Sequence, residues 1–306
     1  SINIWKASFF FVMKSSKKST VVQEVEYPLP KQQVLRNLAA GMYLEKPSLF
    51  PRDAMGVFPD DWQAEVLDCF RLGSPITRVS VAAGHASGKT FLASLLAHVF
   101  MGIYAPSRVV VSGPTGKQTR LQFWAGLNSL WHRSVFMEDM QWQKTKMFVR
   151  GKRNEEEWYT AWVSSSKDSK TIEGFHGPLD GKNLLWIIEE AKAVSDNVFE
   201  ALAGAISNEN CFLYISSTCG APHGHFYMSQ TTLKDQYKIL RIPSTMCPRV
   251  PERKIKEWEK LWGKDSPIFR ARVMAEFPDE ETNCIANLAW IERAIEKEPD
   301  DFDEAA

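Results

Sequence analysis

The stretch Ala83-Gly-His-Ala-Ser-Gly-Lys-Thr90 (AGHASGKT) decides the fold class of this chain. It follows the β-rich run Arg78–Ala83 and opens the apolar, helix-like run Thr90–Met101. A glycine loop between a strand and a helix wraps backbone N–H groups around phosphates, and the helix N-terminus adds a favourable dipole. The spacing therefore predicts a Walker A phosphate-binding loop (G-x-x-x-x-G-K-[ST]), with Ala83 replacing the first glycine and Gly84 one position later.

The side chains of this loop have distinct expected roles. Lys89 should reach the β- and γ-phosphates of ATP as a catalytic group, and the Thr90 hydroxyl should ligate Mg²⁺. The alternative is an ordinary glycine turn with an unrelated lysine, which the flanking strand and helix disfavour. The loop residues expected to bind ATP are Gly84, His85, Ala86, Ser87, Gly88, Lys89 and Thr90.

Two acids end a later apolar run, Leu184-Leu-Trp-Ile-Ile-Glu189-Glu190. Phosphoryl transfer needs one carboxylate for the metal and one for the attacking water. Because ligands bind at strand ends in a doubly wound sheet, this Walker B-like run predicts Glu189 as the Mg²⁺ residue and Glu190 as the catalytic residue that polarises water. The alternative is a pair of solvent-facing acids at the start of a helix.

Two further polar positions fit the same site. The hydroxyls of Ser216-Ser217-Thr218 end the next strand, and Ser217 and Thr218 are predicted to couple γ-phosphate release to movement; a simple turn cap is the alternative. Gln63 precedes the loop by about twenty residues, and its amide can bond both edges of adenine. An exposed glutamine with no such role is the alternative.

Apolar runs alternate with helical patterns through the middle of the chain. Unbroken apolar strands of this kind indicate a mainly parallel sheet that is covered on both faces. The predicted fold class is therefore α/β, a P-loop NTPase (ASCE, RecA-like) with helices flanking the sheet and a small helical lid. The expected strands are Arg78–Ala83, Arg108–Ser112, Leu184–Glu189, Phe212–Ser216 and Tyr237–Ile242.

Proline-rich breaks and composition shifts divide the chain into three expected parts. Residues 1–59 form an N-terminal extension, 60–245 the ATPase core, and 246–306 a lid and linker. A helix is expected at Gln32–Tyr43, irregular chain between Pro51 and Pro59, and a solvated acidic tail at Glu298–Glu304.

Composition excludes several other classes. The net charge is zero, so nucleic-acid binding must rest on local patches. The five scattered cysteines show no CxxC spacing and suit a reducing compartment, and the histidines show no metal-ligand spacing. No apolar run reaches the roughly 20 residues of a membrane span.

A local basic excess lies between Arg108 and Arg153, where nine Lys and Arg face only two acids, Glu138 and Asp139. Tryptophan and phenylalanine interleave with the bases, which suits a surface that follows a nucleic-acid backbone. The alternative is a solvated face whose tryptophans belong to the core.

With these motifs in place, the chain resembles the ATPase domain of terminase large subunits, the motors that package DNA into phage heads. The resemblance runs from about Asp60 to Glu292. It rests on the loop and Glu189-Glu190-Ala191 together with Trp62-Gln63, Ser112-Gly-Pro114-Thr115-Gly-Lys-Gln118, Gly174-Phe-His176-Gly177, Thr218-Cys-Gly220-Ala-Pro222, Gly224-His-Phe226-Tyr227 and Phe269-Arg-Ala-Arg272 with Glu276-Phe277-Pro278.

The chain departs from the family pattern in three respects. Glu189 stands where aspartate is usual. Many relatives carry an arginine in or beside the P-loop, where this chain has Ala82, Gly84 and His85, and the stretch before Walker B offers only Lys182 to act in trans. An arginine neutralises charge in the transition state, so a substitute is expected. The candidates are Arg120, Arg241, Arg270 and Arg272.

The resemblance implies an ATPase that uses ATP and Mg²⁺ to move double-stranded DNA into a procapsid. It also implies a ring of subunits in the host-cell cytoplasm that meets a portal protein and a small terminase subunit, with no membrane contact. The nuclease domain of full-length terminases is expected to be absent, so no DNA cleavage is expected. A helicase-like ATPase and a small-molecule kinase are the alternatives; stimulation of ATP hydrolysis by DNA would argue against the kinase.

Overall fold

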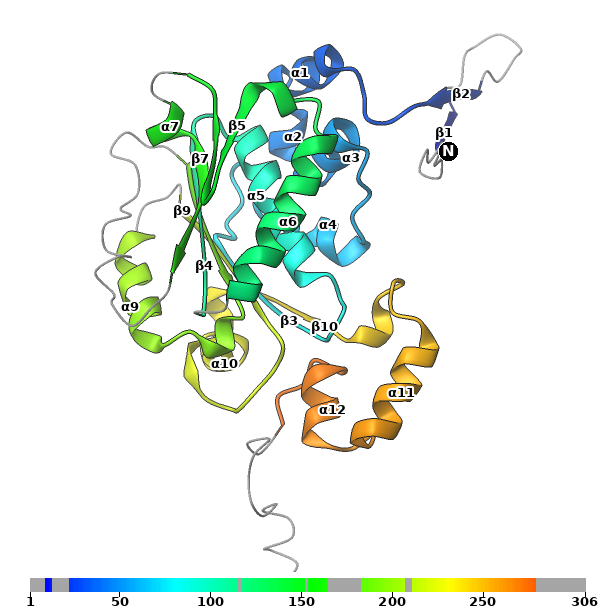
Figure 1. Ribbon diagram of the computed structural model, residues 1–306, viewed down its shortest axis with the longest axis vertical. Coiled ribbons are helices and arrows are strands. Elements are labelled where there is room, and N and C mark those ends of the chain that lie inside the picture. Colours follow the sequence, from blue (N-terminus) through cyan, green and yellow to red (C-terminus); the bar gives the residue numbers. More distant parts are fainter. Residues whose placement is uncertain are drawn as a thin grey trace, which may run out of the picture.

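A computed structural model describes residues 9–12, 22–114, 117–151, 154–164, 183–206 and 211–278. In these residues an eight-stranded sheet runs in the order β10-β3-β9-β8-β4-β7-β6-β5 (Figure 1). The first six strands pair in parallel and the last two continue antiparallel, which confirms the predicted α/β class. The strands are β3 (Arg78–Ala83), β4 (Ser107–Gly113), β5 (Met140–Gln143), β6 (Lys146–Val149), β7 (Tyr159–Ser164), β8 (Asn183–Glu189), β9 (Cys211–Ser217) and β10 (Lys238–Ile242).

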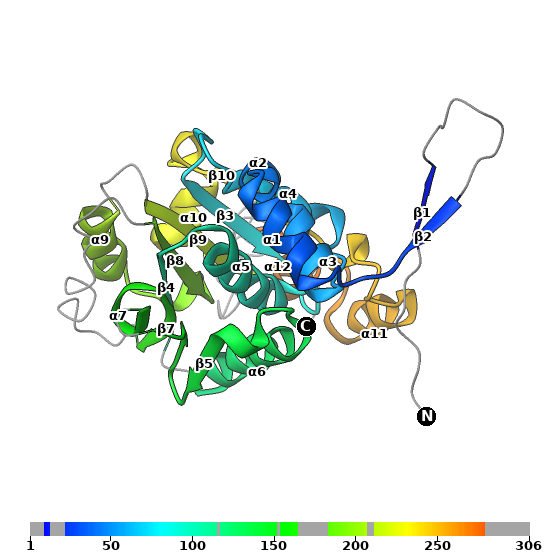
Figure 2. The same cartoon turned by 90° about the horizontal axis from the view of Figure 1, so that it is seen from above.

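Two apolar layers cover the two faces of the sheet. Successive side chains of a strand point to opposite faces, so Leu185 and Ile187 of β8 join one layer while Trp186 and Ile188 join the other. Helices α5 (Lys89–Ile103) and α6 (Lys117–Arg133) pack on the first face, and α9 (Asp196–Ala205) and α10 (Gly224–Gln230) on the second (Figure 2). Burial on both faces explains why β8 reads as an unbroken apolar run.

The register of the parallel strands positions the site. Strand β9 lies between β3, which leads into the P-loop, and β8, which ends in the acids. Glu189 stands opposite Ser216, and Ala82 stands opposite Ser217. The carboxyl ends of all three strands therefore meet at one edge of the sheet.

The segment before the P-loop is more helical than the sequence suggested. The single helix predicted at Gln32–Tyr43 is wrong, because the chain breaks at Gly41, which adopts a left-handed φ of 74°. The irregular stretch after Pro51 is also wrong, since Pro51 lies in the first helical turn, where its missing N–H costs nothing. The elements are α1 (Lys31–Ala39), α2 (Met42–Glu45), η1 (Pro47–Leu49), α3 (Phe50–Met55) and α4 (Asp61–Cys69).

The remaining elements are short. Strands β1 (Phe9–Val12) and β2 (Val22–Val25) pair antiparallel within the N-terminal extension, where no strand was predicted. Strand β5 was not anticipated either. The others are η2 (Met137–Asp139), α7 (Asn154–Glu157), η3 (Ala191–Ala193), η4 (Lys234–Gln236) and η5 (Ser244–Met246). No helix in the described ranges combines the length and apolarity needed to cross a membrane.

After β10 the chain leaves the sheet and forms the predicted helical lid, α11 (Glu252–Trp262) and α12 (Pro267–Arg272), at the lower right of Figure 1. The second helix ends at Arg272, and the chain turns at Ala275, whose φ is 56°. The Gly174–Gly177 motif, Lys182 and the acidic tail lie outside the described residues.

Candidate nucleotide-binding site

The P-loop joins β3 to α5 and carries two left-handed residues. Ala86 has a φ of 56° and Gly88 a φ of 94°. Gly88 is the N-cap of α5, so the loop amides lead directly into the first helical turn, where N–H groups have no partner within the helix. This arrangement of donors at a helix N-terminus suits a phosphate group.

The displaced glycine of the loop has a packing reason. A Cβ atom at Gly84 would lie 2.3 Å from Ser244 Oγ and 2.7 Å from the Val273 carbonyl oxygen, so only glycine fits. The Gly84 amide donates to Ile242 O (2.9 Å) and the His85 amide donates to Arg272 O (2.6 Å). The backbone amides of Gly84 and His85, both predicted to bind ATP, thus bond the backbone of β10 and of the lid. The loop from Ala86 onward leads into α5.

Lys89 lies at the centre of the loop. Its ammonium group donates to the carbonyl oxygens of Ala83 (3.1 Å) and Gly84 (3.0 Å). Burial lowers the pKa of Lys89, and the carboxylates of Glu190 and Glu189 oppose that effect. The predicted catalytic lysine therefore lies within electrostatic range of both predicted carboxylates.

Glu189 is a buried carboxylate held by two hydroxyl groups. Its side chain accepts hydrogen bonds from Thr90 Oγ1 (2.8 Å) and Ser216 Oγ (2.7 Å), and it is 1% exposed. Burial raises the pKa of Glu189, and the two hydrogen bonds act against this rise. Oxygen ligands of this kind are those that Mg²⁺ prefers, so the Thr90–Glu189 pair fits the predicted metal site.

Glu190 follows at a sharp turn of the backbone. Its φ of 50° is unusual for a residue with a side chain, and such strain concentrates at functional sites. Ser217 Oγ donates to Glu190 Oε2 (3.2 Å), and Thr218 Oγ1 accepts from Lys192 Nζ (2.6 Å). Ser217 and Thr218, whose hydroxyls are predicted to couple hydrolysis to movement, therefore contact Glu190 and Lys192, which follow β8.

Gln63 reaches the same loop from the side of α4. Its Oε1 accepts from the Asp60 amide (3.0 Å), while its buried Nε2 has no hydrogen-bond partner among the described residues. That Nε2 lies 3.1 Å from where a Cβ of Gly88 would be. Gln63 thus takes part in the capping box of α4, and its Nε2 lies beside Gly88 of the P-loop; the adenine contact stays a prediction.

Arg249 is a neighbour of the P-loop that the sequence reasoning missed. It forms a two-pronged ion pair with Asp60, with N–O distances of 3.0 and 2.6 Å, and its Nη2 approaches the Ser87 carbonyl oxygen at 3.4 Å. Its sequence neighbours, Pro248 and Val250, belong to no motif. Only the return of the chain from β10 brings it beside α4.

The four arginines named as substitutes occupy different places. Arg241 donates to Gln230, and Arg270 pairs with Glu276 at 3.1 Å, both away from the P-loop contacts. Arg272 packs over the Trp262 ring and bonds the P-loop through its carbonyl oxygen. Arg120 lies on α6 and is half-buried.

His85 does not replace an arginine charge. Its ring lies near those of Trp258 and Trp262, each 6.3 Å away between centroids. Burial, with help from the charges of Lys89 and Arg272, lowers the pKa of His85 to about 4. The imidazole is therefore neutral at pH 7 and supplies no positive charge to the P-loop.

The tryptophans of the basic stretch pack on the apolar core: Trp124 is buried, and Trp131 and Trp142 are partly buried against it. Trp142 packs against Trp124 and Trp131, with ring centroids 5.0 and 5.7 Å apart. This favours the core interpretation of these aromatics.

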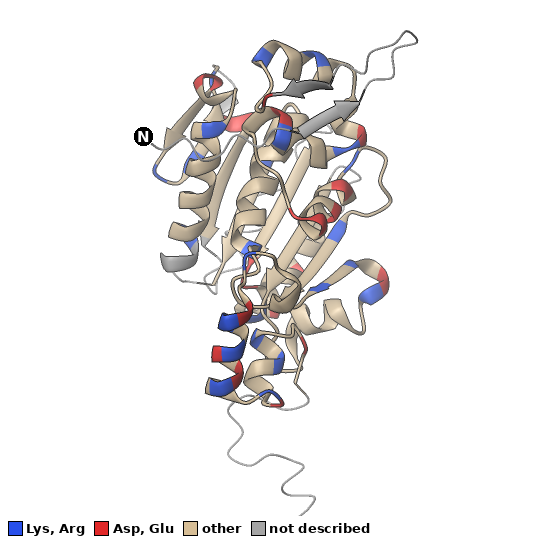
Figure 3. Ribbon diagram, turned by 90° about the vertical axis from the view of Figure 1, so that its right-hand side faces the viewer, with Lys and Arg blue, Asp and Glu red and all other residues tan. Residues whose placement is uncertain are grey.

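Basic and acidic residues alternate along α11 (Figure 3), where Lys254 pairs with Glu257 and Lys256 with Glu252.

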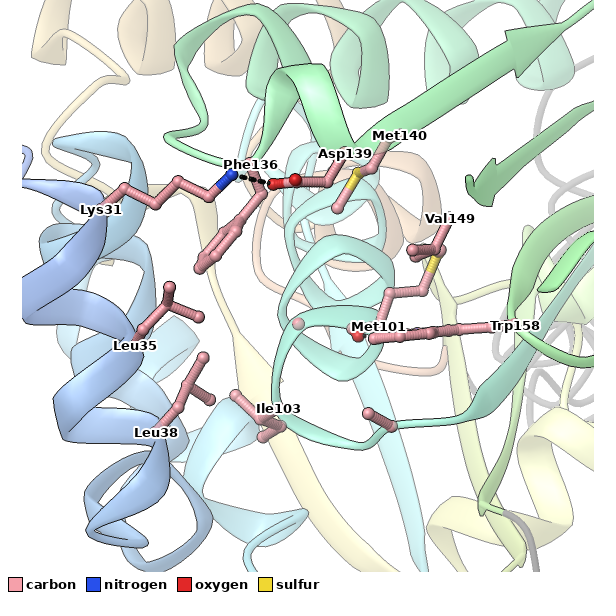
Figure 4. Close-up of a pocket in the computed structure, with 12 residues that line it drawn as sticks. Lys31, Leu35, Leu38, Met101, Ile103, Phe136, Asp139, Met140, Val149 and Trp158 are labelled. Carbon is pink, nitrogen blue, oxygen red and sulfur yellow. Dashed lines mark hydrogen bonds and ion pairs between the residues drawn. The ribbon is translucent and has the colours of Figure 1, made fainter. Parts of the chain in front are cut away.

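A separate apolar cavity of about 620 Å³ lies at the far end of α5 (Figure 4). Met101 and Trp158 line it, and the ion pair of Lys31 with Asp139 crosses its rim. At 1.5 Å per helical residue, Met101 is roughly 18 Å from Lys89 along α5. This cavity is therefore not the phosphate site.

The glycine loop, the paired acids and the intervening strand β9 define a P-loop NTPase. No protein-family model matches the chain. Over 236 residues it is 25% identical to the probable terminase large subunit of Enterobacteria phage P7, a match that covers 71% of this chain and 46% of that protein.

Two solved structures share the fold. The large terminase ATPase domain of Thermus phage P74-26 superposes with a TM-score of 0.55 at 18% identity, covering 76% of this chain and 99% of that one. The large terminase of a thermophilic bacteriophage in complex with ATP-γ-S gives a TM-score of 0.54 at 12% identity, covering 70% and 52%. The resemblance to terminase large subunits is thereby confirmed. The chain spans about half the length of the phage P7 protein and of the ATP-γ-S-bound terminase.

Proposed function

We propose that this chain binds ATP with Mg²⁺ at the P-loop and hydrolyses it to drive double-stranded DNA into a viral procapsid. The observation that carries the proposal is the meeting of Thr90, Glu189, Glu190 and Lys89 at one sheet edge, within hydrogen-bond or electrostatic reach of each other. The similarity to a terminase large subunit supports DNA as the polymer that is moved.

The site residues divide the work of hydrolysis. The amides from Ala86 to Thr90 and the Lys89 ammonium bind the phosphates, and Gln63 Nε2 donates to adenine. Thr90 and Glu189 would hold Mg²⁺, which would neutralise phosphate charge when bound. Glu190 accepts a proton from water as the water oxygen bonds the γ-phosphorus; the bond from that phosphorus to the β–γ bridging oxygen breaks, giving ADP and inorganic phosphate.

The proposed motor has three chain segments, two coupling residues and several partners. We assign residues 60–245 to the ATPase core and 246–306 to the lid, with 1–59 as an extension. Ser217 and Thr218 pass the state of the γ-phosphate to the strand end. We further propose that subunits assemble as a ring in the host cytoplasm and contact a portal protein and a small terminase subunit, as the resemblance implies.

The test is ATP hydrolysis by the purified chain with and without double-stranded DNA. We expect Mg²⁺-dependent hydrolysis that linear duplex DNA stimulates. Stimulation by single-stranded DNA alone would favour a helicase-like ATPase. Phosphate transfer to a small-molecule acceptor, with no effect of DNA, would favour a kinase and contradict the proposal.

A further inference from the structure

Lys192 is a basic residue at the nucleotide site that no motif assigns. It lies two residues after Glu190, in the 3₁₀ turn η3. This turn is closed by backbone bonds from Ala193 N to Glu190 O (2.9 Å) and from Val194 N to Ala191 O (3.2 Å). Ala191 is buried, and its burial holds in place the turn that carries Lys192.

The side chain of Lys192 crosses from β8 to the end of β9. Its Nζ donates to Thr218 Oγ1 (2.6 Å) and approaches Cys219 O (3.4 Å). Its Cδ passes 3.1 Å from where a Cβ of Gly220 would be, so the glycine leaves room for the lysine. The ammonium thus lies at the strand end next to the P-loop strand, although the residue as a whole is exposed.

The charges around Lys192 are those of the phosphate site. Burial lowers the pKa of Lys192 and the charge of Arg272 adds to this effect, while the carboxylate of Glu190 favours the charged form. The positive charge of Lys192 in turn helps to lower the pKa values of Lys89 and His85, which burial lowers most. Lys192 therefore lies within electrostatic range of Lys89, Arg272 and Glu190, where its charge would attract a polyphosphate ligand.

We propose that Lys192 is a cis-acting cation that contacts the γ-phosphate of ATP and reports its presence through Thr218. The inference rests on the function proposed above and adds a residue to that site.

The hydrogen bond from Lys192 to Thr218 connects the proposed phosphate contact to the end of β9. The Thr218 oxygen accepts from Lys192 and retains its own proton, which it can donate to a phosphate oxygen. When the γ-phosphate leaves, both Lys192 and the Thr218 hydroxyl lose the same partner. The end of β9 and the following Cys219–Gly220 backbone then move together.

The experiment compares wild type with Lys192→Met and Lys192→Arg in the full chain. For each protein, the affinities for ADP and for a non-hydrolysable ATP analogue are measured by fluorescence, and kcat and KM by phosphate release. We expect Lys192→Met to keep ADP affinity within about twofold, to lose about tenfold in analogue affinity and to lose about 100-fold in kcat. Lys192→Arg, which keeps the charge, should recover part of both losses.

Lys256→Ala is the matched control, because it removes one lysine from the exposed face of α11. It should leave all four values unchanged. Equal losses for ADP and the ATP analogue in Lys192→Met, or no loss at all, would overturn the inference while wild-type hydrolysis keeps the proposed function intact. Absence of nucleotide binding by the wild type would overturn both. If Lys192→Met unfolds, Thr218→Val decides: it removes the hydroxyl that Lys192 contacts, and an unchanged ADP-to-analogue affinity ratio in this variant contradicts the inference.

Discussion

The two ends of the nucleotide site are built in different ways. At the phosphate end, Glu189 is 1% exposed and held by hydroxyls from α5 and β9. At the predicted base end, on the side of α4, Gln63 is buried and Asp60 pairs with Arg249, which has 48% of its side chain exposed. The phosphate end is a buried network, while the Asp60–Arg249 pair is a partly exposed contact between residues 189 positions apart. Buried polar groups cost more to disturb than exposed ion pairs, so the two ends should respond differently to mutation.

The largest expected effect is at the phosphate end. Lys89→Ala should lower nucleotide affinity by about 100-fold, because a charge-assisted contact with phosphate is lost. Hydrolysis should fall further, by about 1000-fold. Calorimetric titration with ATP and a phosphate-release assay measure the two effects. Wild-type nucleotide affinity in Lys89→Ala would show that Lys89 does not contact the phosphates.

The metal residue should give the next largest effect. Glu189→Gln keeps the shape of the side chain but removes the charge that holds Mg²⁺, so the Mg²⁺-dependent part of ATP affinity should fall by about 100-fold. ATP affinity measured in EDTA should change little. Titration of both proteins with and without Mg²⁺ separates the two contributions, and equal metal dependence would exclude Glu189 as the metal residue.

Acid should weaken the helix that carries the phosphate end. His98 lies in the interior on α5, and neither ring nitrogen has a partner among the described residues. Burial lowers its pKa from 6.5 to about 4, so the unfolded state binds more protons. The contribution is present above pH 6.5 and is lost as the pH falls toward 4, by on the order of 2 kcal/mol at pH 5.

Urea unfolding between pH 7.5 and pH 5 measures this loss. His98→Leu has no titrating group at this position, so its stability should fall less steeply with acid than that of wild type. Parallel pH profiles for the two proteins would show that His98 is charged or solvated in the folded chain.

The smallest effect is expected at the base end. Arg249→Ala removes an exposed ion pair, so it should weaken ATP and ADP binding alike by about threefold to fivefold and leave kcat nearly unchanged. The reversed pair Asp60→Arg with Arg249→Asp should restore part of the affinity if the ion pair itself matters. A large loss of kcat in Arg249→Ala would show that this arginine acts on the phosphates.

Site residues that follow from motif and strand order could be predicted from the sequence, while those that depend on tertiary packing could not. The carboxyl ends of parallel strands lie at one edge, so Lys89, Thr90, Glu189, Glu190 and the Ser216–Thr218 run could be brought together from motif and strand order alone. Arg249 and Lys192 could not, because their contacts depend on where the lid and the η3 turn pack. The break at Gly41 and the helix around Pro51 were missed for a related reason, since tertiary packing overrides local signals.

The role proposed for Glu190 is to activate water at a site that binds ATP. Single-turnover hydrolysis of bound ATP by wild type and Glu190→Gln tests this role, at protein concentrations where both are saturated. We expect Glu190→Gln to bind ATP as wild type does and to hydrolyse it about 1000-fold more slowly. Hydrolysis by Glu190→Gln at the wild-type rate would show that Glu190 does not activate the water.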